Sequence, residues 1–179
     1  MNRIIFIFLS HLIILCGCQK QRTEKIIGEM LGDTIRFPSN MPMSIMGERD
    51  TMLDLMDCDY KIIMYVDSAN CMTCTVKPTQ WNEYVNDLSD DSVNVIALLV
   101  FNPREERKAK DMLYRAMYEH PVYIDKGNRF KILNNIPEET ELQTVLLNRD
   151  NVVLAVGNPV IYPKVRDLYD KIMYSGKTE

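Results

Sequence analysis

Two cysteines separated by two residues follow an apolar run and precede a helix-like segment, and this arrangement constrains the fold more than any other feature. The run extends from Tyr60 to Val66, the cysteines are Cys71 and Cys74, and the helical pattern ends near Leu88. At a helix N-terminus, free N–H groups and the helix dipole favour the thiolate of the first cysteine. A disulfide here closes a loop of four residues, for which the chain-entropy model gives roughly 2 kcal/mol. We therefore expect a redox role rather than a structural one.

The N-terminus has the pattern of a secretory signal. Arg3 precedes the apolar run Ile4 to Leu15, which is shorter than the about 20 residues that span a bilayer. The sequence Leu15-Cys16-Gly17-Cys18 resembles a bacterial lipobox. That resemblance implies a signal peptide at residues 1–17 and a Cys18 carrying more than one acyl chain, such as palmitate, enough for stable anchoring. The alternative is an ordinary buried hydrophobic segment.

The lipobox resemblance implies that the mature chain lies outside the cytoplasm, and its length fits one domain plus a tether. Gln19 rather than Asp follows Cys18, so the inner-membrane retention signal of some lipoproteins is absent, and we expect an outer-membrane anchor facing the periplasm. Residues 18–33 are expected to be the lipidated cysteine and a polar tether, and 34–179 the domain. The net charge of −4 becomes −5 when Arg3 is removed. The basic residues form no stripe, so we expect no nucleic-acid partner.

Hydrophobic periodicity predicts alternating strands and helices after residue 60. Strands are expected at 61–67, 93–101, 122–124, 144–147 and 152–156, with an edge strand at 35–37 and irregular chain at 39–59. Helices are expected after Asn102 as N-cap and Pro103 as first residue, at 128–134, and from Pro163 onward. The first of these carries a face that ends at Met117, and the second directs Phe130 and Leu133 inward.

This order resembles the thioredoxin fold, in the variant with an extra strand and helix before the final hairpin, as in periplasmic TlpA-type disulfide reductases and peroxiredoxins. The resemblance covers about residues 60–174. Its motifs are Asn70-Cys71-Met72-Thr73-Cys74, Val122-Tyr123-Ile124-Asp125 and the hairpin sequence from Gln143 to Val153. It implies an α/β, three-layer fold with a mixed central sheet and helices on both faces.

The resemblance also implies a mechanism. Cys71 is then the attacking thiolate, and Cys74 resolves the mixed disulfide, which needs no cofactor beyond the two sulfurs. The expected partners are protein thiols or disulfides and an upstream redox protein. Asp67, at the end of the first central strand, is a possible proton acceptor through water. The alternative for Asp67 is an ordinary turn residue.

Three positions depart from the family pattern. Asn70 stands where tryptophan usually precedes the first cysteine, and Tyr65 stands where thioredoxins have a buried carboxylate. Gln143, followed by Thr144, aligns with the cis-proline that shapes the substrate groove and keeps metals from the thiols. A peroxidase is disfavoured because Ser68, rather than threonine, lies three residues before Cys71.

Metal binding is the weaker alternative. Methionines cluster before residue 60 and thioethers bind Cu(I), but such residues more often fill apolar gaps. A zinc set of Cys58, Cys71, Cys74 and His120 has one close ligand pair instead of two, and His120 is expected to end a helix. We therefore expect no metal. The competing function is a non-catalytic thioredoxin-fold lipoprotein that binds a partner or a soft metal such as copper or zinc.

Overall fold

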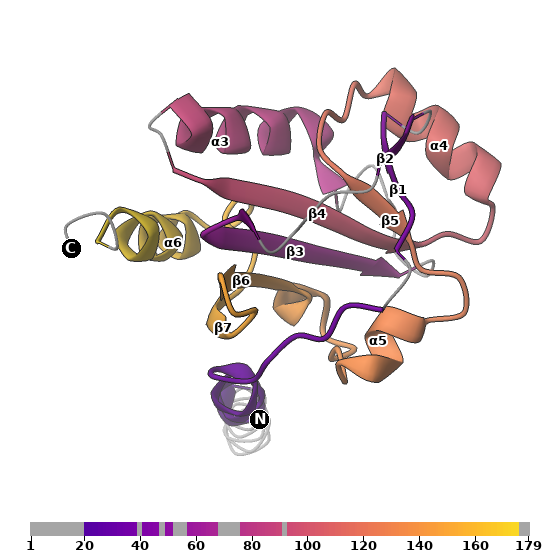
Figure 1. Ribbon diagram of the computed structural model, residues 1–179. Coiled ribbons are helices and arrows are strands. Elements are labelled where there is room, and N and C mark those ends of the chain that lie inside the picture. The colour runs from indigo at the N-terminus through magenta and orange to yellow at the C-terminus, as the bar shows by residue number, and fades with distance from the viewer. Residues whose placement is uncertain are drawn as a thin grey trace, which may run out of the picture.

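The computed structural model describes residues 20–38, 41–46, 49–51, 57–67, 76–90 and 93–175. Within them, helices cover both faces of a central mixed sheet (Figure 1). A helix at residues 20–30 precedes the following elements in chain order: β1 (Met43–Ile45), β2 (Arg49–Thr51), β3 (Tyr60–Asp67), α3 (Pro78–Asp90), β4 (Val95–Asn102), α4 (Glu106–Arg115), β5 (Val122–Ile124), α5 (Arg129–Leu133), a 3₁₀ turn (Thr140–Leu142), β6 (Thr144–Asn148), β7 (Val153–Val156) and α6 (Pro163–Ser175).

The strand order determines which loops meet. Within the described ranges, the sheet has seven strands in the order β2-β1-β5-β4-β3-β6-β7. β3, β4 and β5 are parallel, whereas β6 is antiparallel to β3 and β7 to β6. The carboxyl ends of β3, β4, β5 and β7 and the start of β6 therefore lie along one edge of the sheet, which we call the carboxyl edge. In open α/β sheets this edge is where ligands bind.

β3 and β4 are central because their apolar runs are continuous and buried on both faces. They pair in parallel from Tyr60 with Val95 to Asp67 with Asn102. One charged residue interrupts the run, since Lys61 is 0% exposed. Its Nζ donates a hydrogen bond of 2.8 Å to the carbonyl of Arg149 in the β6–β7 turn, which satisfies the buried ammonium group locally.

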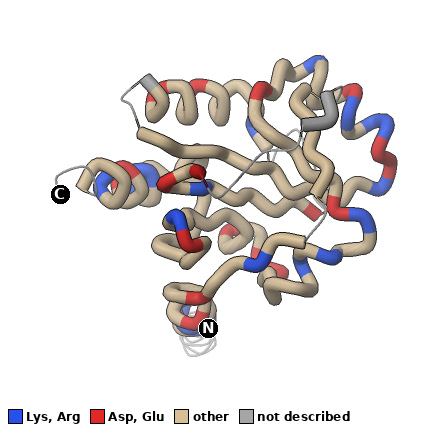
Figure 2. The backbone as a smooth tube through the Cα atoms, in the orientation of Figure 1, with Lys and Arg blue, Asp and Glu red and all other residues tan. Residues whose placement is uncertain are grey.

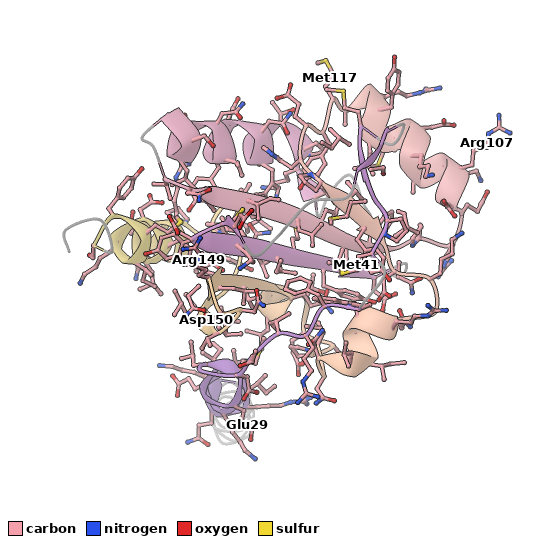
Figure 3. All side chains as sticks on the ribbon, viewed as in Figure 1. Glu29, Met41, Arg107, Met117, Arg149 and Asp150 are labelled. Atoms are coloured by element: carbon pink, nitrogen blue, oxygen red, sulfur yellow. The ribbon has the colours of Figure 1, made fainter. Side chains whose placement is uncertain are left out.

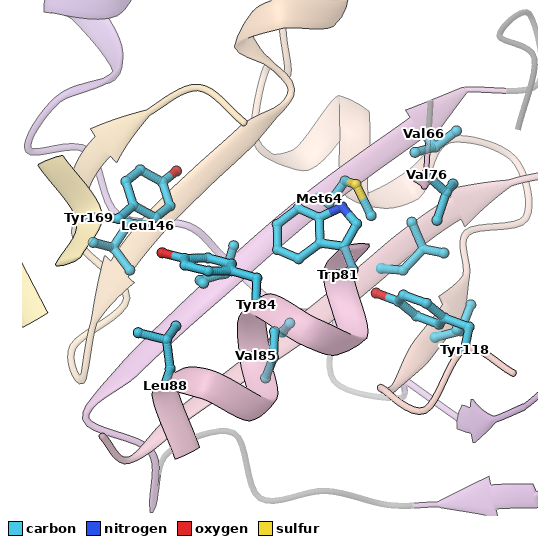
Figure 4. Close-up of a cluster of buried hydrophobic side chains, with 14 of the residues drawn as sticks. Met64, Val66, Val76, Trp81, Tyr84, Val85, Leu88, Tyr118, Leu146 and Tyr169 are labelled. Atoms are coloured by element: carbon cyan, nitrogen blue, oxygen red, sulfur yellow. The ribbon is translucent and has the colours of Figure 1, made fainter. Parts of the chain in front are cut away.

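Two hydrophobic cores lie on opposite faces of the sheet. The first unites β3 and β4 with α3, α4 and α6, and Figure 4 shows its centre, where Trp81 and Tyr84 pack against Met64 and Leu146. The second contains Phe130 of α5 and is covered further by Met30 of the N-terminal helix. This layering gives the α/β architecture expected from the sequence, with β5 and α5 as the additional strand and helix before the hairpin.

Two expectations for the edge of the sheet are wrong. Residues 35–37 form no strand, although Thr34 makes an isolated bridge with Val152. Residues 39–59, expected to be irregular, contain the β1–β2 hairpin, and β1 pairs with β5. Strands of three residues are too short to show a period of two, and a partner strand far along the chain decides their pairing.

The helices differ from expectation mainly at their ends. Asn102 is the last residue of β4 rather than an N-cap, and α4 starts at Glu106 instead of Pro103. Met117 lies beyond α4 in left-handed backbone with φ 47°, and its side chain is 64% exposed. In α5, Phe130 is buried as expected, but Leu133 is 41% exposed. A five-residue helix has room for one inward position, and Phe130 occupies it.

The chain is ordered before the expected domain boundary. Residues 20–30, expected to be mostly tether, are helical. Arg22 forms an ion pair of 2.8 Å with Glu139, and the Gly32 N–H donates to the carbonyl of Val153 at 3.0 Å. These contacts join the N-terminal helix to the β6–β7 side of the domain. No helix in the described part of the chain has the length and apolar character to cross a membrane.

His120 is buried rather than helix-terminal, because α4 ends at Arg115. It is 9% exposed and meets Tyr118 edge-on at 5.6 Å. Burial lowers the pKa of His120 below its ordinary value of 6.5, against smaller raising contributions from Glu119 and a backbone hydrogen bond to Trp81. The neutral imidazole is therefore the form that the fold stabilises.

This burial predicts a pH dependence of stability. Because the folded-state pKa is depressed, the unfolded chain binds more protons below pH 6.5, and the free energy of unfolding falls as the pH decreases from there. Replacing His120 with Phe keeps the ring contact and removes the titration. As the pH falls from neutral to about 5, we expect the wild type to lose more unfolding free energy than His120→Phe. Urea unfolding at both pH values measures this difference. A pH-independent difference would contradict this.

Candidate functional site

The cysteine pair belongs to the segment that joins β3 to α3. Cys71 and Cys74 lie outside the described residues, as does Cys18. The described chain stops at Asp67, the last residue of β3, and resumes at Val76, which is 0% exposed, just before α3. The thiol segment, residues 68–75, thus starts at the carboxyl edge. The groups placed around that point are the described part of the candidate site.

Asp67 is held by a lysine from the inserted helix. Lys131 of α5 forms an ion pair of 3.1 Å with Asp67 and a second of 2.8 Å with Glu138. The Lys131 side chain is 13% exposed, so the pair with Asp67 is shielded from water on most sides. Burial opposes the charged lysine, but hydrogen bonds to Glu138 and Asp67 outweigh it and raise the pKa of Lys131. The arrangement fixes a carboxylate and an ammonium group where the thiol segment begins.

A polar network lies beside this ion pair and ties three strand ends together. Tyr65 of β3 donates a hydrogen bond of 2.9 Å to Oδ1 of Asn128, which also accepts from Asn102 at the end of β4. Lys131 Nζ lies 5.8 Å from the centre of the Tyr65 ring. Burial and the neighbouring Asp67 carboxylate raise the pKa of Tyr65 far above its ordinary value, so the phenol stays protonated. A neutral donor thus stands where thioredoxins carry a buried acid.

Asp125 positions the helix that supplies Lys131. Its side chain is 0% exposed, and its two carboxylate oxygens accept the Phe130 N–H at 3.0 and 3.1 Å. Asn128, with φ 57°, turns the chain between them. Left-handed backbone is tolerated best by glycine and asparagine. The sequence therefore determines the start of α5 through one carboxylate and one asparagine.

Gln143 and Thr144 lie directly beside the end of β3. The Tyr65 N–H donates to the Gln143 carbonyl at 2.8 Å, and Thr144 pairs with Met64. Gln143 is 4% exposed, and its amide Nε2 donates to the Pro137 carbonyl at 2.9 Å. Its Oε1 is buried and has no hydrogen-bond partner among the described residues. The peptide bonds of the described ranges are all trans.

A shallow hollow borders this loop on the side of α6. It has a volume of about 90 Å³ and is lined by Met64, Tyr65, Thr140, Glu141, Thr144, Asn158, Ile161 and Tyr162. Ile161 and Tyr162, from the loop after β7, are 37% and 40% exposed. Asn158 fixes that loop by accepting the Val160 N–H at 2.9 Å. The hollow therefore presents apolar side chains next to the start of β6.

Sequence reasoning selected Asp67, Gln143 and Thr144, and the structure places all of them near the end of β3. It missed Lys131, Asn128 and the loop at Asn158. Lys131 and Glu138 have opposite charges seven residues apart, but that spacing is common on surfaces and does not identify Asp67 as a third member. No group of three or more histidine, cysteine or acidic side chains gathers as a metal site within the described ranges.

Comparison with solved structures identifies the fold. A domain of a possible thiol-disulfide isomerase from Cytophaga hutchinsonii matches with a TM-score of 0.52 and 17% identity, covering 83% of this chain and 97% of that one. AhpC from Enterococcus faecalis matches with a TM-score of 0.61 and 10% identity, covering 83% of this chain and 95% of that one. The thioredoxin domain of a thiol-disulfide oxidoreductase from Bacteroides vulgatus matches with a TM-score of 0.56 and 13% identity, covering 78% of this chain and 97% of that one. The chain has a thioredoxin-like α/β fold of the peroxiredoxin type.

Sequence comparisons add little to this. No family model matches the chain. An uncharacterized WD repeat-containing protein of Schizosaccharomyces pombe is 35% identical over 94 residues, which is 52% of this chain and 15% of that protein. The chain therefore spans a small fraction of this relative. The match carries no functional argument. The blades of a WD repeat protein are four-stranded sheets, whereas β3, β4 and β5 of this chain are parallel strands connected through helices.

Proposed function

We propose that this protein is a lipid-anchored, extracytoplasmic thiol–disulfide oxidoreductase that uses Cys71 and Cys74. One observation carries the proposal: in a thioredoxin-like fold, the chain has its two-residue-spaced cysteine pair between the central strand β3 and the helix α3. The segment that carries this thiol pair begins at the carboxyl edge, and a helix N-terminus beside the first cysteine would favour its thiolate. The substrates are disulfides of other proteins.

The reaction is a two-step exchange. The Cys71 thiolate attacks a substrate disulfide, forms a mixed disulfide and releases one substrate thiolate. Cys74 loses its proton and attacks the Cys71 sulfur, which releases the second substrate thiolate and leaves a Cys71–Cys74 disulfide. The substrate gains two electrons, and the protein loses them. A thiol-bearing redox partner must then reduce the protein again.

Asp67 is the proposed acceptor of the Cys74 proton, through a water molecule. The support is geometric: the ion pair with Lys131 at 3.1 Å holds the Asp67 carboxylate at the end of β3, where the thiol segment begins. The raised pKa of Tyr65 excludes that phenol as the base at neutral pH.

A redox titration tests the proposal. The protein is equilibrated with mixtures of reduced and oxidised dithiothreitol, and the thiols of Cys71 and Cys74 are counted by alkylation and mass spectrometry. We expect one reversible two-electron transition shared by both cysteines. Cys58, which lies before β3, serves as an internal reference that does not join this transition. Independent titration of the two cysteines would refute the exchange mechanism.

The lipid anchor has its own test. Replacing Cys18 with Ser removes the acylation site, and we expect the protein to move from the membrane pellet to the soluble fraction of the cell envelope. The reason is that the acyl chains supply the membrane affinity. Cys58→Ser is the matched control and should remain in the pellet. A Cys18→Ser protein that stays in the pellet after signal removal contradicts the lipoprotein assignment.

Gln143 motivates the competing function, a thioredoxin-fold lipoprotein that binds a partner or a soft metal without efficient exchange. Its amide stands where the fold commonly has a proline that blocks metal approach to the thiols. We expect the wild type to reduce insulin disulfides more slowly, and to bind Zn(II) more tightly, than Gln143→Pro. Proline also removes the weak Gln143 N–H bond to Thr140 at 3.3 Å, so folding is checked by circular dichroism. Identical behaviour of both folded proteins would show that Gln143 does not influence the thiols.

A further inference from the structure

A second, basic concavity lies at the carboxyl edge on the far side of β5. We call it the basic pocket; it has a volume of about 310 Å³ and is lined by Pro42, Ser44, Glu106, Lys110, Tyr123, Ile124, Lys126 and Arg129. Its walls come from β1, the first half of α4, the end of β5 and the chain leading into α5. In Figure 2 the backbone of α4 in this region alternates between basic and acidic residues.

The pocket has more positive than negative charge. Glu106 is its one lining carboxylate, and it pairs with Lys126 at 2.7 Å and Lys110 at 3.3 Å. Hydrogen bonding from Lys126, more than that from Lys110, lowers the pKa of Glu106, so the carboxylate is charged. The single negative charge of Glu106 neutralises one of the two lysine charges. Arg129 makes no ion pair within the described part of the chain. The lining therefore has a net charge of +2.

Two nearly buried hydroxyl-bearing residues complete the wall. Ser44 on β1 and Tyr123 on β5 are each 5% exposed. Arg129 lies close enough to Tyr123 to lower its pKa, although burial dominates and the net shift is upward. Arginine, lysine and hydroxyl donors around one concavity are the groups that bind carboxylate oxygens, and arginine does so through two parallel hydrogen bonds.

The pocket lies within reach of the end of β3, where the thiol segment begins. β5 is two strands from β3 in the sheet, and neighbouring strands are about 4.8 Å apart, so the two strand ends are separated by roughly 10 Å. Three residues of extended peptide span about the same distance. A polypeptide whose disulfide meets the end of β3 can therefore place a side chain three residues away in the basic pocket.

We infer that the basic pocket binds an acidic side chain of the protein whose disulfide is exchanged, and so selects substrates with aspartate or glutamate about three residues from the reactive cysteine. This rests on the proposed function and specifies its substrate class. The chain as a whole has a net charge of −4, which repels acidic proteins in general. The pocket therefore attracts a substrate whose acidic residue lies at the right distance from its cysteine, and does not attract a substrate that is acidic only at other positions. A free dicarboxylate has the same carboxylate groups as an acidic side chain, and the experiment below distinguishes the two ligands.

The experiment uses the full-length chain in a neutral detergent and two disulfide-bridged peptides. They differ in having glutamate or glutamine three residues from the cysteine. We expect kcat/KM for the glutamate peptide to exceed that for the glutamine peptide about tenfold, or about 1.4 kcal/mol. In Arg129→Gln the ratio should fall to about one. Arg107→Gln is the matched control, because Arg107 is on α4 but projects away from the body of the molecule (Figure 3), and its ratio should stay at the wild-type value.

A binding arm separates failure of the pocket from failure of the redox proposal. The glutamate peptide with serine in place of cysteine is labelled, and its affinity is measured by fluorescence anisotropy. We expect it to bind wild type and Arg107→Gln alike, to bind Arg129→Gln about tenfold more weakly, and to lose affinity in 1 M salt, where the Debye length is about 3 Å. Binding without disulfide reduction would support the pocket and refute the oxidoreductase.

Two results would overturn the inference while leaving the oxidoreductase intact. The first is reduction of both peptides at equal rates together with no anisotropy change for the serine peptide. The second is displacement of that peptide by succinate at an equal concentration, which would show that the pocket recognises a free dicarboxylate as well as it recognises a peptide.

Discussion

Replacing Cys71 with Ser should reduce the rate of insulin-disulfide reduction on the order of a thousandfold or more, since the nucleophile of a covalent mechanism is removed. Cys74→Ser should lose turnover to a similar extent for a different reason. It keeps the attacking thiolate but cannot resolve the mixed disulfide, so a covalent adduct with the substrate accumulates. Steady-state reduction and nonreducing gel electrophoresis measure the two effects.

The two cysteines are also expected to differ in reactivity. In the proposed mechanism Cys71 is the attacking sulfur and must have the lower thiol pKa, so it should be alkylated before Cys74 at neutral pH in the reduced wild type. Cys58→Ser is the control and should retain both activity and the order of labelling. An adduct that forms in Cys71→Ser but not in Cys74→Ser would reverse the assigned roles.

Replacing Asp125 with Ala should lower the free energy of unfolding by about 3 kcal/mol, because a buried backbone donor loses its charged acceptor. Asp125 is 0% exposed and accepts the Phe130 N–H with both oxygens. Asp125→Asn keeps one acceptor oxygen and should lose about 1 kcal/mol. Urea unfolding at neutral pH measures both values. The graded order is specific to a lost hydrogen-bond acceptor.

Asp111→Ala provides the control for this series, since Asp111 is an exposed residue of α4. We expect its unfolding free energy to stay within about 0.5 kcal/mol of the wild type. The Asp125 variants should also lose disulfide-exchange activity beyond their loss of stability, because α5 carries the Lys131 that holds Asp67. An Asp125→Ala protein as stable as Asp111→Ala would show that Asp125 does not fix the start of α5.

Much of the fold was predictable from local pattern. The long apolar runs of β3 and β4 identify central strands, since a strand buried on both faces needs no alternation. Pro163 correctly marks the start of α6, because its fixed φ and missing N–H suit the first helical turn. The β6–β7 hairpin follows from the turn around Asn151, which adopts φ 65°. In each case the determining interaction is local in the chain.

The errors came from contacts between distant residues. β1 is a strand because the edge of β5 offers unpaired backbone groups, and nothing within residues 43–45 indicates that partner. His120 is buried and has a backbone hydrogen bond to Trp81, which is distant in the chain, whereas its neighbours in the chain suggested a helix end. Met117 is exposed because α4 ended earlier than its apolar pattern implied.

The sequence by itself determined the chemistry that is available: a thiol pair after a central strand, an acid at the end of that strand and a glutamine before the hairpin. Tertiary structure alone decided which groups surround them. Lys131 lies 64 residues from Asp67 in the chain and 3.1 Å from it in space, and Arg129 joins Ser44 in one pocket. The physical reason is that local pattern determines strands and helices, whereas the packing of α5 against the sheet brings the charges together.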